Sequence, residues 1–263
     1  MATPRTASPT SLREAYRRVT DSIAEAATRA NRKPADIITV AVTKNATPDQ
    51  IRQLVEMGHG DLGENRVQQL QQRVPQLAEF LGRKKTLAGA VPKQHEITPD
   101  KVRWHMIGHL QRNKVKAVVP LVQLIHSVDS LRLAEELHAY GARTDRVIDV
   151  LIQVNTSGEA SKSGVAPPAV AHVAEQIDTM IHLRFRGLMT MAPYSDDPED
   201  ARPTFARTAE LFHDLRANKV GGDACTVLSM GMSGDFEVAI EEGANVLRIG
   251  RALFGEGEAQ PDD

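Results

Sequence analysis

The chain has 263 residues and a single cysteine, Cys225. One thiol excludes an intrachain disulfide and a cysteine-based zinc site, and it fits a reducing compartment. Long apolar runs are also missing, since none approaches the roughly 18 residues that span a bilayer. Residues 1 to 19 lack the apolar region of a signal peptide. The sequence therefore predicts a cytoplasmic protein that does not enter a membrane.

The chain has no excess of charge of either sign. Its 32 basic residues stand against 34 acidic ones, which gives a formal net charge of -2. Nucleic acids and anionic membranes are bound by strongly basic surfaces, so neither is predicted as a partner. Hydrophobic residues make up 41% of the chain, a share that allows a full core in a soluble globular protein.

Eight apolar, strand-like segments alternate with helical segments along most of the chain. A further amphipathic helix is predicted before them, from Ser11 to about Asn31. This count predicts an α/β fold, a single (β/α)8 TIM barrel over residues 11–255 with an extra N-terminal helix. The predicted strands cover residues 38–45, 61–65, 102–108, 124–128, 147–154, 183–191, 226–230 and 245–249.

A doubly wound open sheet is the alternative fold. Such a sheet carries its phosphate-binding glycines near the first strand, whereas the glycine-rich turns of this chain come late. The position of these turns favours the barrel.

Three segments fall outside the alternation of strands and helices. Residues 1–10 are small, polar and proline-containing, which predicts a disordered leader. Residues 82–100 follow a helix predicted from Val67 to about Leu81, show no clear period, and are interpreted as an inserted surface loop. Residues 256–263 are predicted to form an acidic tail.

The first predicted strand, ITVAVTKN at 38–45, ends close to Lys44. In a barrel, the residues that follow the strands meet at one face, where active and binding sites are built. An amine partly shielded from water at that face is a nucleophile toward an aldehyde. Taken alone, Lys44 is more simply interpreted as a solvated lysine at a strand end. It becomes a candidate site residue only if other binding groups face it across the barrel.

Two glycine-containing loops follow the seventh and eighth predicted strands. The first runs SMGMSG from Ser229 to Gly234, and the second is RIGR from Arg248 to Arg251. Their hydroxyl and N–H groups suit phosphate oxygens, and barrels often bind phosphate in these two loops. Either loop alone is as well explained by a tight turn with a helix cap. Together, facing Lys44, they predict pyridoxal 5'-phosphate held as an imine.

Other polar residues are weaker candidates for a site. His105 and His109 stand four residues apart, a spacing that joins metal ligands on a helix, but this segment is predicted as strand followed by loop. No metal site is therefore predicted. Trp104 and Cys225 are interpreted as packing residues.

Several segments, taken in order, resemble the YggS/PROSC family of pyridoxal phosphate homeostasis proteins, which have an alanine-racemase-like barrel. The resemblance spans residues 38 to 255. The matching segments are AVTK at 41–44, GEN at 63–65, WHMIGHLQRNK at 104–114, HSVDS at 126–130, QVNTSGEASKSG at 153–164, RGLMTM at 186–191, LSMGMSGDFEVAI at 228–240 and LRIGRALFG at 247–255.

The resemblance implies a role for each candidate residue. Lys44 is the residue that forms the Schiff base, and Asn65 lies near the cofactor ring. Arg248 contacts the cofactor, either at the ring nitrogen or at the phosphate. The residues implied in the phosphate cradle are Ser229, Gly231, Ser233 and Gly250.

The family further implies a function in pyridoxal phosphate homeostasis, with little or no catalytic turnover. The protein would act as a monomer that buffers the cofactor or delivers it to pyridoxal phosphate-dependent apoenzymes. The alternative is a weak amino-acid racemase or a related carbanion enzyme. Racemases carry a second domain, and the chain ends at Asp263, soon after Gly255, which favours the binding protein. A phosphate-sugar enzyme without pyridoxal is a third alternative.

Overall fold

A computed structural model describes residues 11–87, 101–156 and 163–255 of the chain. Its eight parallel strands pair in sequence order and close into a barrel, because β1 pairs with both β2 and β8. The predicted TIM barrel is therefore confirmed over the open sheet. The strands are β1 (Ile38–Val42), β2 (Asp61–Glu64), β3 (Arg103–Met106), β4 (Leu124–Val128), β5 (Ile148–Gln153), β6 (Leu183–Met189), β7 (Val227–Ser229) and β8 (Val246–Ile249).

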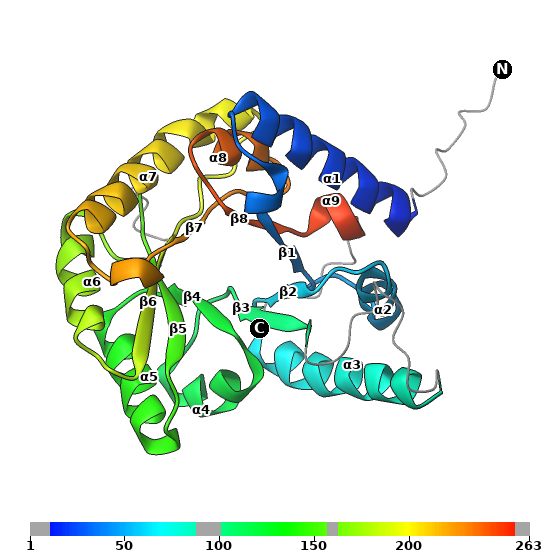
Figure 1. The fold of residues 1–263 in the computed structure, drawn as a ribbon, viewed down its shortest axis with the longest axis horizontal. Helices are drawn as coiled ribbons and strands as arrows, with labels where there is room; N and C mark the ends of the chain where they lie inside the picture. Colours follow the sequence, from blue (N-terminus) through cyan, green and yellow to red (C-terminus); the bar gives the residue numbers. More distant parts are fainter. Residues whose placement is uncertain (1–10, 88–100, 157–162, 256–263) are drawn as a thin grey trace.

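Helices surround the strands on the outside of the barrel (Figure 1). Most buried apolar residues of the strands and of the inner helix faces form one large core, as expected for a parallel sheet covered by helices, and Leu124, Leu151 and Met189 form a second, small cluster. The α-helices are α1 (Leu12–Arg29), α2 (Pro48–Glu56), α3 (Val67–Leu87), α4 (Val115–Val118), α5 (Leu131–Thr144), α6 (Val170–Asp178), α7 (Arg202–Ala217), α8 (Phe236–Glu241) and α9 (Arg251–Phe254).

Helix α1 is the extra helix predicted before the first strand. Ser11 and Glu14 form a capping box at its start, in which each side chain bonds the other residue's backbone N–H. The apolar face of α1 includes Val19 and Ile23, both buried, and the helix packs beside α8 and α9. It therefore closes the barrel wall where the first and last strands meet.

Helix α3 runs further than the sequence predicted. It ends at Leu87 rather than near Leu81, so residues 82–87, expected to begin the inserted loop, are helical. An ion pair between Arg83 and Glu79 one turn apart, and another between Lys84 and Glu56 of α2, stabilise the added turns. Residues 88–100 lie outside the described residues, as do the predicted leader and tail.

Residues 112–121 form three short helical pieces. A 3-10 turn, η3 (Arg112–Lys114), precedes α4, and a second, η4 (Val119–Leu121), follows it. Pro120 lies inside η4, near its start, instead of ending the helix before it. Proline is accepted there because the first residues of a helical turn have no N–H partner to lose.

Trp104 and Cys225 are buried packing residues, as predicted. Burial raises the pKa of the Cys225 thiol to about 11, which keeps it in its unreactive protonated form.

Candidate functional site

The carboxyl ends of the strands surround a pocket of about 540 Å3. Five of the seven residues predicted for the site line it, so Lys44 and residues of both late loops border one pocket. Ser229 and Gly231 are not among the lining residues. The five are Lys44, Asn65, Ser233, Arg248 and Gly250, and the pocket is also lined by Val42, Ile107, His109, Gln153, Met191 and Arg251.

Lys44 lies in the turn after β1 rather than in the strand. The ladder ends with the bond from the Thr43 N–H to the Gly63 carbonyl, 2.9 Å long, and the next residue leaves the sheet. Lys44 is exposed, so it is less shielded from water than a strand position implied. Its amine makes no hydrogen bond or ion pair with any residue the structure describes, which leaves Nζ available to a ligand.

A buried ion pair holds the turn that carries Lys44. Glu64, at the end of β2, is 0% exposed, and its Oε2 lies 2.5 Å from an Arg73 guanidinium nitrogen and 2.8 Å from Thr43 Oγ1. Arg73, on α3, also donates to the carbonyls of Thr43 and Ala46. Because Thr43 and Ala46 flank the turn, this pair fixes both of its sides.

Arg73 was not among the predicted site residues. Its sequence neighbourhood, VQQLQQRVPQL at 67–77, reads only as a helix, and the contact to Glu64 depends on how α3 lies against β2.

Ser233 joins the two late loops at the rim of the pocket. Its Oγ accepts the N–H groups of Gly250, at 3.3 Å, and Ala252, at 3.2 Å. The backbone N–H groups of Ser233 and Arg251 have no partner in the described part of the chain. A serine hydroxyl beside unpaired N–H groups is a donor set that suits an anion such as phosphate.

Arg248 lies at the inner end of the pocket and is only 3% exposed. Its guanidinium donates to Ser229 Oγ and to the Thr190 carbonyl, each at 2.7 Å. Burial lowers the pKa of Arg248 to about 10, so the group remains a cation at neutral pH. Ser229 therefore acts from behind the pocket, by holding this cation in place.

Gly231 shapes the loop from outside the pocket. Its φ is +92°, and a Cβ placed on it would lie 2.6 Å from the Cβ of Ala239 in α8. Its carbonyl accepts the Arg248 N–H at 3.0 Å. Glycine is required here because the loop turns in a left-handed conformation directly against a helix.

A chain of hydrogen bonds crosses the inside of the barrel below Arg248. Ser229 Oγ lies 3.0 Å from His126 Nδ1, and His126 Nε2 lies 3.0 Å from His105 Nδ1. His105 Nε2 lies 3.2 Å from Asp61, which Arg103 also binds through two hydrogen bonds. The hydrogen bonds from Arg103 and His105 outweigh burial and hold the pKa of Asp61 well below its usual range.

When both imidazoles are neutral, Arg248 at one end of this row of hydrogen bonds and Asp61 at the other fix which atom donates each hydrogen. Arg248 can only donate, so Ser229 accepts from it and gives its own hydrogen to His126 Nδ1. His126 then donates from Nε2 to His105, which donates from its Nε2 to Asp61. The pocket cation is thus connected to a carboxylate near the opposite end of the barrel.

His126 makes stability depend on pH. Full burial, together with the nearby charge of Arg248, lowers its pKa well below the ordinary value. The unfolded chain therefore binds a proton that the folded chain does not, and stability falls as pH drops below about 6.5 toward the lowered pKa. We expect His126→Gln to reduce the slope of unfolding free energy against pH by about 1.4 kcal/mol per pH unit in that range, measured by denaturant titration.

The exposed His172 on α6 supplies the control for this measurement. His172→Gln should leave the slope unchanged, and part of the slope should persist in His126→Gln, because burial also lowers the pKa of His59. An unaltered slope in His126→Gln would show that His126 is protonated in the folded protein.

Asn65 presents an unsatisfied group to the pocket. Its Oδ1 is buried and has no hydrogen-bond partner within the described residues. A Cβ on Gly108 would lie 2.2 Å from the Asn65 carbonyl oxygen, so the loops after β2 and β3 touch at this point. A buried amide oxygen without a donor costs about 1–3 kcal/mol.

His109 and Gln153 also line the pocket. His109 Nδ1 lies 3.0 Å from Asp129 Oδ2, and the Gln153 amide donates to the Ser163 carbonyl at 2.8 Å. Gln153 interrupts the apolar run VIDVLIQV at 147–154, and this polar residue at a strand end was the available signal. Among the described residues, no group of three or more side chains is arranged to hold a metal ion.

Comparison with known proteins identifies the family. A family model described as the N-terminal domain of alanine racemase matches residues 20–258. A pyridoxal phosphate homeostasis protein of Aquifex aeolicus is 40% identical over 244 residues, which cover 92% of this chain and 97% of that protein. The chain belongs to the pyridoxal phosphate homeostasis protein family.

Solved structures of this family share the fold. An unknown protein from Bifidobacterium adolescentis is 34% identical with a TM-score of 0.79, covering 92% of this chain and 94% of that one. PipY of Synechococcus elongatus, in a structure with PLP bound, is 30% identical with a TM-score of 0.67, covering 89% of this chain and 100% of that one. The described part of this chain holds no helix that is long and apolar enough to cross a membrane.

Proposed function

We propose that this protein binds pyridoxal 5'-phosphate as a Schiff base on Lys44 and acts in cofactor homeostasis, by storing and delivering it. The observation that supports this most strongly is that an unpaired amine and an anion-binding rim line one pocket. The relatives named for pyridoxal phosphate homeostasis and the PLP-bound PipY structure support the same proposal.

The residues of the pocket fit this cofactor. A volume of about 540 Å3 lies within the usual range for small-molecule sites. The unsatisfied Oδ1 of Asn65 calls for a donor, and Arg248 provides a buried cation. When bound, pyridoxal phosphate supplies an aldehyde that condenses with an amine and a ring that can withdraw electrons.

Each side chain has a separate task in this proposal. Ser233 and the backbone N–H of Arg251, which follows Gly250, hold the phosphate at the rim, and Lys44 supplies the amine. Arg248 contacts the ring nitrogen, because Ser229 and Thr190 fix its guanidinium at the inner end, away from the rim. A cation at the ring nitrogen keeps that nitrogen unprotonated and weakens the electron withdrawal that carbanion chemistry needs. Ser229 and Gly231 support the site from behind.

Borohydride trapping tests the proposal. The purified holoprotein should absorb visible light as an imine does, and borohydride should bleach this absorbance. Mass spectrometry of the digested product should then place the reduced cofactor on the peptide that contains Lys44. A trapped cofactor on another lysine would contradict the assignment, and a protein with no visible chromophore would point to the phosphate-sugar alternative.

Exchange of the α-proton in deuterated water separates storage from catalysis. Holoprotein incubated with single-enantiomer amino acids should exchange far more slowly than about 1 per second, the lower end of typical enzyme turnover. Exchange at enzyme-like rates would instead establish a racemase or a related carbanion enzyme. His109, which lines the pocket and is held by Asp129, is the residue to replace in that case.

The proposed setting is a monomer in the cytoplasm that passes its cofactor to pyridoxal phosphate-dependent apoenzymes. Mixing the holoprotein with such an apoenzyme should restore that enzyme's activity. Sedimentation of the holoprotein should give the mass of one chain.

A further inference from the structure

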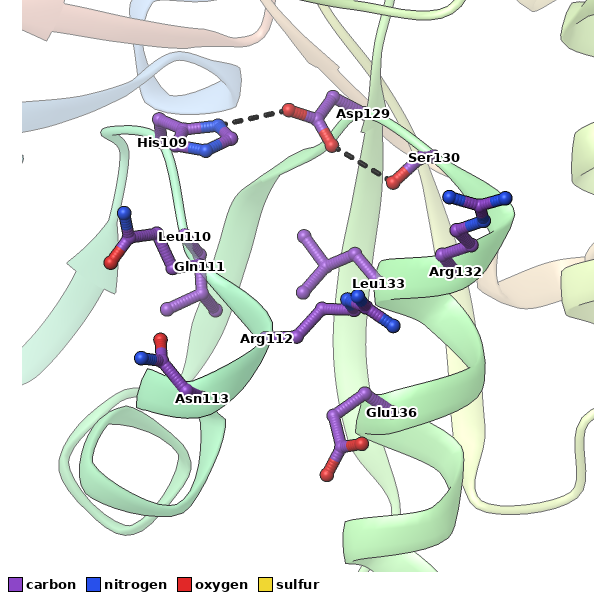
Figure 2. Close-up of a pocket in the computed structure, with 10 residues that line it drawn as sticks. All are labelled: His109, Leu110, Gln111, Arg112, Asn113, Asp129, Ser130, Arg132, Leu133 and Glu136. Carbon is purple, nitrogen blue, oxygen red and sulfur yellow. Dashed lines mark hydrogen bonds and ion pairs between the residues drawn. The ribbon is translucent and has the colours of Figure 1, made fainter.

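A second cavity has a volume of about 680 Å3, and Figure 2 shows the residues that line it. One wall is the segment after β3, and the other is the first part of α5. His109 lines both cavities, so they share a side chain. The lining residues are His109, Leu110, Gln111, Arg112, Asn113, Asp129, Ser130, Arg132, Leu133 and Glu136.

The acidic side chains of this cavity already have partners. Asp129 accepts from Ser130 Oγ at 3.1 Å and lies 3.0 Å from His109 Nδ1. Glu136 accepts from Arg143, further along α5, at 3.3 Å. Glu136 is therefore paired with a cation, whereas Asp129 is held by hydrogen bonds alone.

The two guanidinium groups of the cavity, unlike its carboxylates, have no side-chain partner among the described residues. Arg112, on η3, and Arg132, on α5, make no ion pair or hydrogen bond with any side chain that the structure describes. Figure 2 shows the Arg112 side chain extending from the first wall toward α5. The two guanidinium groups outnumber Asp129, the one lining carboxylate without a cationic partner among the described residues, so the cavity has a net positive charge.

We propose that this second cavity binds a phosphate monoester, with Arg112 and Arg132 as its anion-binding residues. Planar guanidinium groups bind phosphate oxygens through paired hydrogen bonds, which makes arginine well suited to this ligand. The cavity volume is that of a small-molecule site, which favours a metabolite over an acidic protein segment. The amides of Gln111 and Asn113 add hydrogen-bonding groups to one wall.

The second cavity and the pocket that contains Lys44 share a wall. The inference rests on the proposed function in one respect, namely that pyridoxal phosphate occupies the pocket with Lys44. His109 is held by Asp129 on the side of the second cavity and also borders the pocket that contains Lys44. A phosphorylated form of the cofactor that has left Lys44 would therefore find a second anion site next to the first. Because the described lining of the second cavity contains no lysine, binding there is non-covalent.

Blocking the first pocket allows the second to be tested in the holoprotein. Borohydride fixes the cofactor on Lys44, and intact mass confirms that every chain carries it. Pyridoxine 5'-phosphate, which has no aldehyde, and inorganic phosphate are then titrated in separate arms and followed by 31P NMR or equilibrium dialysis. We expect one further equivalent of pyridoxine 5'-phosphate to bind. Binding of inorganic phosphate as well would show that the site recognises phosphate alone, whereas its failure to bind would show that the ring is recognised too.

Substitution of the exposed arginines assigns the bound ligand to this cavity. Arg112→Gln and Arg132→Gln should each weaken binding about tenfold or more, since each removes a charge-assisted hydrogen bond. Arg207→Gln, on the surface of α7, should leave binding unchanged. Absence of a second equivalent, or binding that neither substitution weakens, would overturn this inference. Failure to trap the cofactor on Lys44 would instead contradict the proposed function.

Discussion

Replacement of Lys44 with alanine is expected to abolish the visible chromophore and the borohydride-trapped adduct completely. Lys44 is the only lysine among the described residues that line the pocket, so none of those residues offers a second amine. Lys44 is exposed and unpaired, so the fold should lose less than about 0.5 kcal/mol of unfolding free energy. Absorbance spectra before and after borohydride, together with thermal unfolding, measure both effects.

The same variant should retain weak, non-covalent binding at the rim. The donors around Ser233 do not depend on the amine, so Lys44→Ala should still bind a phosphorylated vitamer in dialysis. Lys116→Ala, an exposed lysine on α4, is the matched control and should keep the full chromophore. An intact chromophore in Lys44→Ala would refute the assignment of the Schiff base.

Replacement of Arg73 with alanine is expected to destabilise the protein by about 3–5 kcal/mol. The reason is the Glu64 carboxylate, which is 0% exposed and would be left buried without its cation. The carbonyls of Thr43 and Ala46 would also lose their donor. Denaturant unfolding of the two proteins at pH 7 gives the difference directly.

A second arginine on the same helix provides the comparison. Arg83 pairs with Glu79 on the surface of α3, and Arg83→Ala should change the unfolding free energy by less than about 1 kcal/mol. Replacing the whole pair, as in Glu64→Gln with Arg73→Met, should recover much of the stability because no buried charge remains. A small effect of Arg73→Ala would show that water reaches Glu64 and that the pair does not hold the turn.

The Arg73 variants also test the position of Lys44. If Arg73 acts through the turn that carries the amine, Arg73→Lys should form the imine more slowly while the fold stays largely intact. Lysine keeps the charge but cannot reach both carbonyls and the carboxylate with a planar fork. The rate at which the chromophore appears in apoprotein mixed with pyridoxal phosphate measures this effect separately from stability.

The fold was predictable because its signals are local. Apolar runs such as VIDVLIQV and the amphipathic pattern from Ser11 onward depend on neighbouring residues, and eight alternations admit few arrangements other than a closed barrel. The predicted ends of the helices and strands were less accurate than the predicted fold. Helix α3 passed its predicted end because its last turns gain ion pairs, one of them to Glu56 of another helix, a contact that periodicity does not reveal.

The site was predictable only in its outline. Lys44, Ser233 and Gly250 follow strand ends, and barrel geometry brings all such positions to one face. Ser229 was grouped with them because it stands in the same glycine-containing loop. Its place within β7 turns its hydroxyl toward Arg248 and His126 instead of toward the pocket.

The sequence by itself determined the barrel, the position of Lys44 at its mouth and the two loops that face it, because strand order and strand ends follow from the chain. The tertiary structure alone decided the ion pair of Glu64 with Arg73, the hydrogen-bond chain from Asp61 to Arg248, and the second cavity beside His109. These features join residues from different strands and helices, some of them, such as His126 and Ser229, 103 positions apart. Only the packing of those elements sets which polar groups meet, are buried or remain without a partner.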